Sequence, residues 1–233
     1  MKTLGADVQL PLLTEGAAAE ARVPRLRGVS HALAFILAAG AALRAVALAP
    51  AGRATVAVAI YGAGLVALFG GSAVYHRWPS AGPVKAALQR LDHSTIFVFI
   101  AASYTPIALL VLQGALAWVI LGIAWTGAAA GVTLSLGWID APRRVITCSY
   151  LALGWLAVLA LPGLLDRLGP QPLALVAGGG LLYSAGAVIH ARQRPDPWPR
   201  WFGFHEIFHA LVIVAAAAQY IALVDWVLPS AGA

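Results

Sequence analysis

The sequence predicts an all-α integral membrane protein, a bundle of seven transmembrane helices. Of its 233 residues, 61% are hydrophobic and only 10% are charged, whereas soluble domains carry about 25% charged residues. Most of the chain divides into apolar segments long enough to cross roughly 30 Å of hydrocarbon as a helix. Because lipid offers no partner to backbone polar groups and an open sheet would leave unpaired edges, such segments must be helical.

Seven apolar segments follow one another with short linkers. They lie at about 29–49, 54–76, 84–112, 115–137, 145–165, 172–191 and 200–228. Together they predict one transmembrane domain, residues 29–228, and a short outer tail, residues 229–233. Residues 1–28 contain acidic residues and no continuous apolar core with a cleavage site, so we interpret them as a flexible cytoplasmic tail and not as a signal peptide.

The lysines and arginines predict the orientation, because basic loops remain on the cytoplasmic side. With the N-terminus inside, 12 basic residues are cytoplasmic and 3 are outside. The cytoplasmic set is Lys2, Arg22, Arg25, Arg27, Arg77, Lys85, Arg90, Arg143, Arg144, Arg192, Arg194 and Arg200, and the outer set is Arg44, Arg53 and Arg167. An odd number of crossings then places the C-terminus outside.

The formal charge of +6 does not indicate a nucleic-acid partner, because the basic residues form no dense run and fit membrane topology. Cys148 is the only cysteine, which excludes an intramolecular disulfide and a cysteine-based zinc site. We interpret it as a packing residue.

Histidines at the cytoplasmic ends of the helices predict a metal site. His205 and His209 are four residues apart near the start of the seventh segment, so both rings lie on one helical face. His76 ends the second segment, and Ser72 lies one turn before it. Since the second helix ends where the third and seventh begin, His76, Asp92, His205 and His209 share one leaflet.

Three neutral imidazoles with an open fourth position are the ligand set of a catalytic zinc, whose bound water has a pKa of about 7. Asp92 is the candidate base, or it orients a histidine or offsets the charge of the ion. Ser72 either lies beside the metal or bonds back to its own helix.

The other histidines and Glu206 allow more than one interpretation. We interpret His93 as a packing or interfacial residue, because it points about 100° away from Asp92. His31 and His190 lie at helix ends without an evident partner, and we leave them outside the site. His205-Glu206-Ile-Phe-His209 matches H-E-x-x-H, in which the glutamate is the general base of a zinc protease. An intramembrane protease is therefore an alternative.

The combination of motifs resembles the hemolysin III family. It consists of Ser72-Ala-Val-Tyr-His76, Arg90-Leu-Asp92-His-Ser-Thr, Ser103-Tyr-Thr-Pro106 and Gly203-Phe-His205-Glu-Ile-Phe-His209. That bacterial family is similar to the progestin and adiponectin receptors and, more distantly, to alkaline ceramidases.

The resemblance covers almost everything after Arg25. It implies seven helices, an inside N-terminus, Zn²⁺ held by His76, His205 and His209, and a water between Asp92 and the ion. It also implies that Ser72 belongs to the site and that Glu206 has no zinc-protease role. The location it implies is the bacterial cytoplasmic (inner) membrane.

Our leading functional hypothesis is a zinc-dependent hydrolase of a membrane lipid, with an amide bond as the candidate scissile bond. The alternatives are a non-enzymatic lipid-sensing or membrane-homeostasis protein with structural zinc, the intramembrane zinc protease, and a cytolysin or pore former. The last fits poorly, because a secreted pore former needs a water-soluble state. A membrane lipid is the expected partner in the leading hypothesis.

Overall fold

The computed structural model describes residues 24–138 and 141–231, and over them seven helices are long and apolar enough to cross a membrane. The prediction of an all-α, seven-helix protein is confirmed. In chain order the spans are α2 (Val29–Leu48), α3 (Arg53–Arg77), α4 (Gly82–Pro106) with the π turn Ile107–Val111, α5 (Gly114–Gly137), α6 (Arg143–Gly154) continued by the 3-10 segment Trp155–Ala160 and α7 (Leu161–Leu168), α8 (Pro170–Arg192), and α9 (Phe204–Ala222) continued by the π turn Leu223–Val227 and α10 (Leu228–Ser230).

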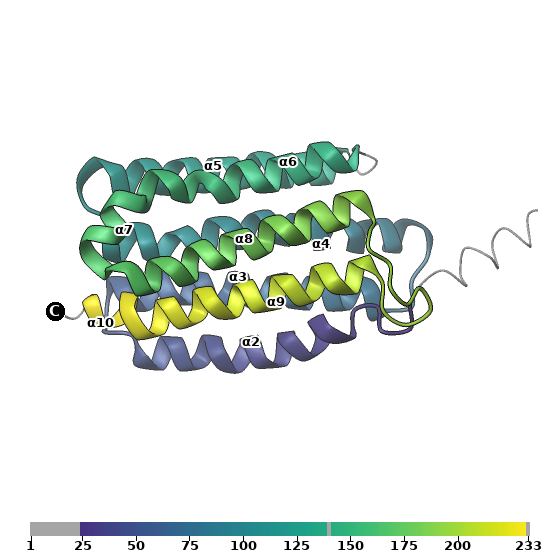
Figure 1. Ribbon diagram of the computed structural model, residues 1–233, viewed down its shortest axis with the longest axis horizontal. Helices are drawn as coiled ribbons and strands as arrows, with labels where there is room; N and C mark the ends of the chain where they lie inside the picture. The colour runs from purple at the N-terminus through teal and green to yellow at the C-terminus, as the bar shows by residue number, and fades with distance from the viewer. Residues whose placement is uncertain (1–23, 139–140, 232–233) are drawn as a thin grey trace, which may run out of the picture.

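The helices run side by side along one axis, and successive spans alternate in direction (Figure 1). α3 packs against both α2 and α4, α4 packs against α5, and α8 packs against α9. Residue 24 and α10 lie at opposite ends of the bundle, as an odd number of crossings requires. The end at which α3 and α8 finish and α4 and α9 start is called the site end below.

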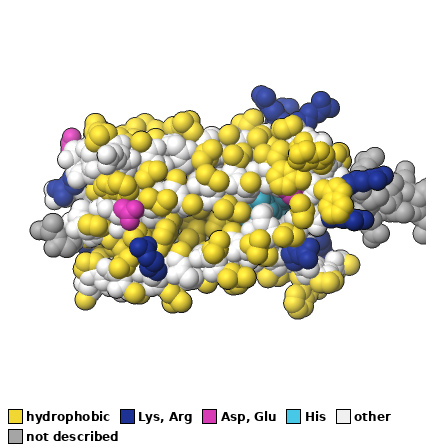
Figure 2. Space-filling view, turned by 60° about the horizontal axis from the view of Figure 1, so that its bottom comes forward, with side chains coloured by type: hydrophobic (Ala, Val, Ile, Leu, Met, Phe, Trp, Pro, Cys, Tyr) yellow, Lys and Arg dark blue, Asp and Glu magenta, His cyan; other side chains and the backbone are white. Residues whose placement is uncertain are grey.

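The outer surface is apolar, as a lipid-facing surface must be. Large hydrophobic side chains such as Ile36, Leu37 and Leu43 are exposed, and Figure 2 shows apolar side chains over the length of the bundle. Cys148 is exposed too, so our interpretation of it as a packing residue is wrong. Small residues bring the helices close instead: a Cβ added at Gly64 would lie 2.6 Å from the Cβ of Ala102.

The fifth span is not one continuous α-helix, because Trp155–Ala160 is wound as a 3-10 helix. The hydroxyl of Tyr104, on α4, donates a hydrogen bond to the carbonyl of Gly154 and accepts one of 2.7 Å from the amide of Ala157. Trp155 also donates from its indole Nε1 to Ser184 Oγ on α8, at 3.1 Å. These bonds satisfy backbone and side-chain groups where the winding changes, inside a region without bulk water.

A short segment before α2, residues 24–28, crosses the site end and is called the N-terminal strap here. Its Arg25 amide donates to the Arg200 carbonyl at 3.0 Å, and its Leu26 amide donates to the Trp201 carbonyl at 3.3 Å. The Arg25 guanidinium also lies 4.6 Å from the centroid of the Trp201 ring. Residues 1–23, the rest of the expected tail, lie outside the described residues. The strap therefore joins the start of the first span to the loop before the last.

Candidate metal centre

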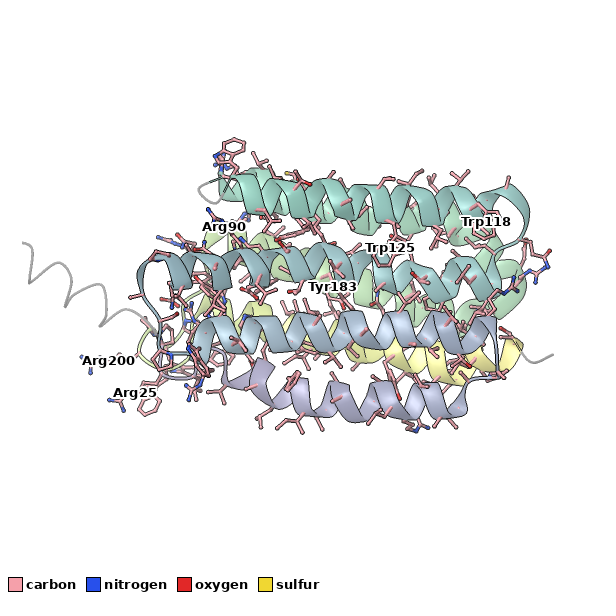
Figure 3. All side chains as sticks on the ribbon, turned by 180° about the vertical axis from the view of Figure 1, so that it is seen from behind. Arg25, Arg90, Trp118, Trp125, Tyr183 and Arg200 are labelled. Atoms are coloured by element: carbon pink, nitrogen blue, oxygen red, sulfur yellow. The ribbon has the colours of Figure 1, made fainter. Side chains whose placement is uncertain are left out.

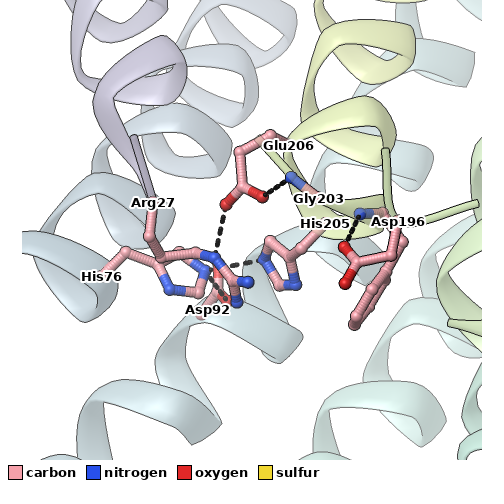
Figure 4. Close-up of polar contacts among 8 residues, drawn as sticks. Arg27, His76, Asp92, Asp196, Gly203, His205 and Glu206 are labelled. Carbon is pink, nitrogen blue, oxygen red and sulfur yellow. Dashed lines mark hydrogen bonds and ion pairs between the residues drawn. The ribbon is translucent and has the colours of Figure 1, made fainter. Parts of the chain in front are cut away.

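Three histidines from two helices meet at the site end. His76 lies in the last turn of α3, and His205 and His209 lie in the first turns of α9. One ring nitrogen from each lies within 4.8 Å of the other two. Nε2 of His76 and Nε2 of His205 are 3.1 Å apart (Figure 4). Two nitrogens bound to one tetrahedral zinc at 2.0–2.1 Å lie about 3.4 Å from each other, so the observed spacing fits a shared ion.

The candidate donor nitrogens have few other partners. Nε2 of His76 and Nε2 of His205 hydrogen-bond each other, and Nδ1 of His209 is buried without a hydrogen-bond partner among the described residues. Imidazole nitrogen suits zinc, copper, iron and nickel, and three such ligands with an open position are common in catalytic zinc sites. The histidines therefore form a group that can hold a transition-metal ion.

Asp92 and Ser72 lie beside this group. Oδ2 of Asp92 is 3.8 Å from Nε2 of His76, and the Ser72 side chain lies beside the Asp92 carboxylate. Both residues are buried and line the same cavity as the three histidines. The structure thus brings all five residues singled out from the sequence to one place, from α3, α4 and α9.

Glu206 is engaged elsewhere. Its Oε1 accepts a hydrogen bond of 2.5 Å from Nε of Arg27, and its Oε2 accepts one of 2.8 Å from the amide of Gly203 (Figure 4). The second bond runs from the N-cap amide to the side chain of the third helical residue, and it satisfies one amide that would otherwise be unpaired at the start of α9. Only 2% of the Glu206 side chain is exposed. Both carboxylate oxygens therefore support the fold, and neither is directed at the histidines.

His31 and His190, which we left outside the site, lie against two of the candidate ligands. The His31 ring stacks on the His209 ring, with centroids 3.6 Å apart, and the His190 ring centroid is 5.3 Å from that of His205. His93 lines the same cavity as these residues. A topological signal was present in the sequence: α2 begins and α8 ends at the site end, so His31 and His190 had to lie at the depth of the ligands.

A cavity of about 1260 Å³ opens from this cluster into the bundle. All six histidines, Ser72 and Asp92 line it, whereas Glu206 does not. Its body is mostly apolar, with side chains such as Ile100, Leu164, Val176 and Val212. Along α9 it reaches from His205 to Gln219, which is about 21 Å at 1.5 Å per residue.

A polar pair lies in the part of the cavity far from the histidines. Tyr183 donates from its hydroxyl to Oε1 of Gln219, at 3.4 Å, and Figure 3 shows Tyr183 between the layers of helices. Pockets that bind drug-sized ligands have volumes of about 300–1,000 Å³. The volume, the length and the apolar walls of this cavity therefore suit a long amphiphile with its polar end at the histidines.

Comparisons with known proteins agree with this architecture. The profile of the family described as "Haemolysin-III related" matches residues 20–220. The chain is 32% identical to "Hemolysin-3" of Bacillus cereus over 178 residues, which cover 76% of this chain and 78% of that protein. It is 30% identical to the "Hemolysin-3 homolog" of Bacillus subtilis over 165 residues, covering 71% and 74%.

A human protein is similar as well. The chain is 33% identical over 168 residues to the "Monocyte to macrophage differentiation factor" of Homo sapiens, covering 70% of this chain and 67% of that protein. The family profile spans all seven helices up to Tyr220, and with them the strap and the three-histidine group. This chain therefore belongs to the haemolysin-III related family.

Proposed function

We propose that this protein is a zinc-dependent hydrolase of a membrane lipid, with an amide bond as the candidate scissile bond. The observation that carries the proposal is the continuity between the three-histidine group and the cavity. A ligand whose chain occupies the apolar body would present its polar end to the histidines. Since only the histidine end of the cavity is strongly polar, the reacting bond would lie near the head of the lipid.

His76, His205 and His209 would hold the zinc, which supplies an activated water and a Lewis acid when bound. Asp92 would be the proton acceptor of this site, because it is buried beside His76 and lines the cavity. The Ser72 hydroxyl, which lies beside the Asp92 carboxylate, would orient it by donating a hydrogen bond. Each residue thus has a role in hydrolysis that its position supports.

The alternative of an intramembrane protease receives less support. That mechanism needs Glu206 as general base, and both oxygens of Glu206 accept other hydrogen bonds. Glu206 is also absent from the cavity lining. Asp92 is therefore the better candidate for the base.

The test is turnover by purified protein. A lipid extract from a bacterial inner membrane, where we expect the protein to reside, is incubated with detergent-purified protein and analysed by mass spectrometry for released fatty acids. Asp92→Asn should retain zinc and lose more than 99% of turnover, because removal of a general base costs about 10²–10⁴-fold.

Glu206→Gln is the matched control. It should retain turnover, because glutamine keeps the shape of Glu206 and its one amide oxygen can still accept from Arg27 or from the Gly203 amide, while neither contact involves the histidines. The converse pattern, in which Glu206→Gln is inactive and Asp92→Asn is active, would support the protease mechanism. Full zinc occupancy with no lipid product would instead favour the non-enzymatic lipid sensor. Leakage from liposomes that contain the protein tests for a pore.

A further inference from the structure

The buried ion pair between Arg27 and Glu206 has one member inside the cavity and one outside. Arg27, on the strap, lines the cavity, whereas Glu206 does not. The Arg27 side chain is 20% exposed, so solutes in the cavity can reach it. Figure 4 shows its guanidinium on the same side of α9 as His76 and His205. The pair therefore presents a positive group to the space in front of the histidines.

The Arg27 guanidinium has N–H donors that Glu206 does not use. Arginine carries five N–H donors, and Glu206 uses the one on Nε. Among the described residues, no hydrogen-bond acceptor pairs with the two Nη groups of Arg27. The second oxygen of Glu206 is occupied by the Gly203 amide and cannot complete a two-point contact. The Nη pair is the part of the guanidinium that binds carboxylate and phosphate in a fork.

Anchoring the strap does not require Arg27. Two backbone hydrogen bonds and the Arg25–Trp201 contact already attach it to the loop before α9. Two other cationic side chains of the lining, Lys85 and Arg200, add positive charge to that of Arg27. Two carboxylates, Asp92 and Asp196, oppose these three cations, and Asp196 accepts a hydrogen bond of 3.2 Å from the Phe204 amide.

We propose that Arg27 is the residue that selects an anionic head group on the single-chain lipid bound in this cavity. The inference rests on the proposed function for the lipid character of the ligand. The head group is a carboxylate, such as the fatty-acid product of amide hydrolysis, or a phosphate monoester. Glu206 positions the Arg27 guanidinium through the hydrogen bond from Nε. Its carboxylate also competes with the anionic head group for the positive charge of Arg27.

The test is a binding measurement that needs no turnover. Purified protein in neutral detergent, as isolated and again after chelation of metal, is titrated with three palmitoyl lipids: palmitate, lysophosphatidate and neutral monopalmitoylglycerol. The wild type should bind at least one anionic lipid about 10-fold or more tightly than the neutral lipid, because a charge-assisted hydrogen bond contributes at least that ratio. The preferred anion identifies the source of the head group.

Arg27→Gln should bring the ratio of anionic to neutral affinity close to 1 and leave the neutral affinity unchanged. Arg25→Gln, a control on the same strap whose residue does not line the cavity, should keep the ratio. Glu206→Gln should raise it, because the competing carboxylate is removed and the position remains a hydrogen-bond acceptor. A purely structural pair would not show these opposite signs.

An unchanged ratio in Arg27→Gln, or a lower ratio in Glu206→Gln, would overturn the proposal. Should Arg27→Gln not fold, Arg27→Lys keeps the charge without the fork and should lower the ratio only in part. Loss of the ratio in Arg27→Gln without any hydrolysis by the wild type would support the anion site and reject the hydrolase.

Discussion

The imidazole of His31 lies flat against that of His209, with ring centroids 3.6 Å apart and planes inclined by 10°. His31 is 3% exposed, its ring meets Phe69 edge-on at 5.0 Å, and both of its ring nitrogens are buried without a hydrogen-bond partner among the described residues. The stack fixes the ring plane of His209, a candidate ligand. The contact comes from α2, a helix that supplies no candidate ligand itself. It also places a polar ring at a position where burial of an apolar ring would cost less free energy.

This stack predicts different outcomes for two substitutions. His31→Phe should keep the ring contact and raise thermal stability, since a buried unpaired polar group costs about 1–3 kcal/mol. His31→Ala should lower stability, because it removes the stacking, roughly 0.5–1.5 kcal/mol, and leaves a void against His209. Thermal unfolding of detergent-purified variants measures both. If His31→Phe is as unstable as His31→Ala, the two nitrogens have partners in the native protein.

Gly28 lies close to the candidate ligand His76, and its substitution should disturb the metal site. It has a φ of 75°, and an added Cβ would lie 2.5 Å from the Cβ of His76. Gly28→Ala should therefore displace either the strap or His76 and lower metal occupancy, with a loss of about 1 kcal/mol or more in stability. Gly52→Ala is the matched control, because Gly52 has a φ of 94° and nothing within 4 Å of the added Cβ. Equal metal content in the two variants would mean that the strap does not support His76.

Metal analysis should find one zinc per chain. His76→Ala, His205→Ala and His209→Ala should each lose most of it, because a three-ligand site does not survive the loss of one imidazole. His93→Ala should retain it, since His93 is not among the three clustered histidines. Plasma emission spectrometry on detergent-purified protein measures the content. Full occupancy in His76→Ala would reject a site shared between α3 and α9.

Reporter fusions should place the N-terminus in the cytoplasm and the C-terminus outside. The count of 12 basic residues against 3 sets this direction, and the seven spans put the two ends on opposite sides. A phosphatase fusion, active only outside, and a fluorescent fusion, active only inside, report each end. Finding the reverse orientation would move the metal site to the outer leaflet.

Most of the fold could be predicted from the sequence, because the bilayer restricts it so strongly. An apolar segment of about 20 residues has one stable form in lipid, and short linkers make neighbouring helices antiparallel. The alternating direction of successive helices then places four residues at one end of the bundle without any knowledge of contacts: His76, Asp92, His205 and His209. Hydrophobicity and topology determine depth in the membrane, and depth alone brings the three candidate ligands to one end of the bundle.

Only the tertiary structure decided which way each side chain points from its helix. It also decided which helices that are distant in sequence pack together. His31 and His190 lie at the correct depth, yet only the contacts of α2 and α8 with α9 show that their rings face the ligands. Glu206 matches a catalytic motif, and only its pairing with Arg27, 179 residues away in the chain, shows that its carboxylate is used elsewhere. The sequence by itself determined the helices, their alternation and the depth of the histidines, because these depend on local hydrophobicity. The stack, the ion pair and the cavity depend on how small residues let the helices approach, which no single segment encodes.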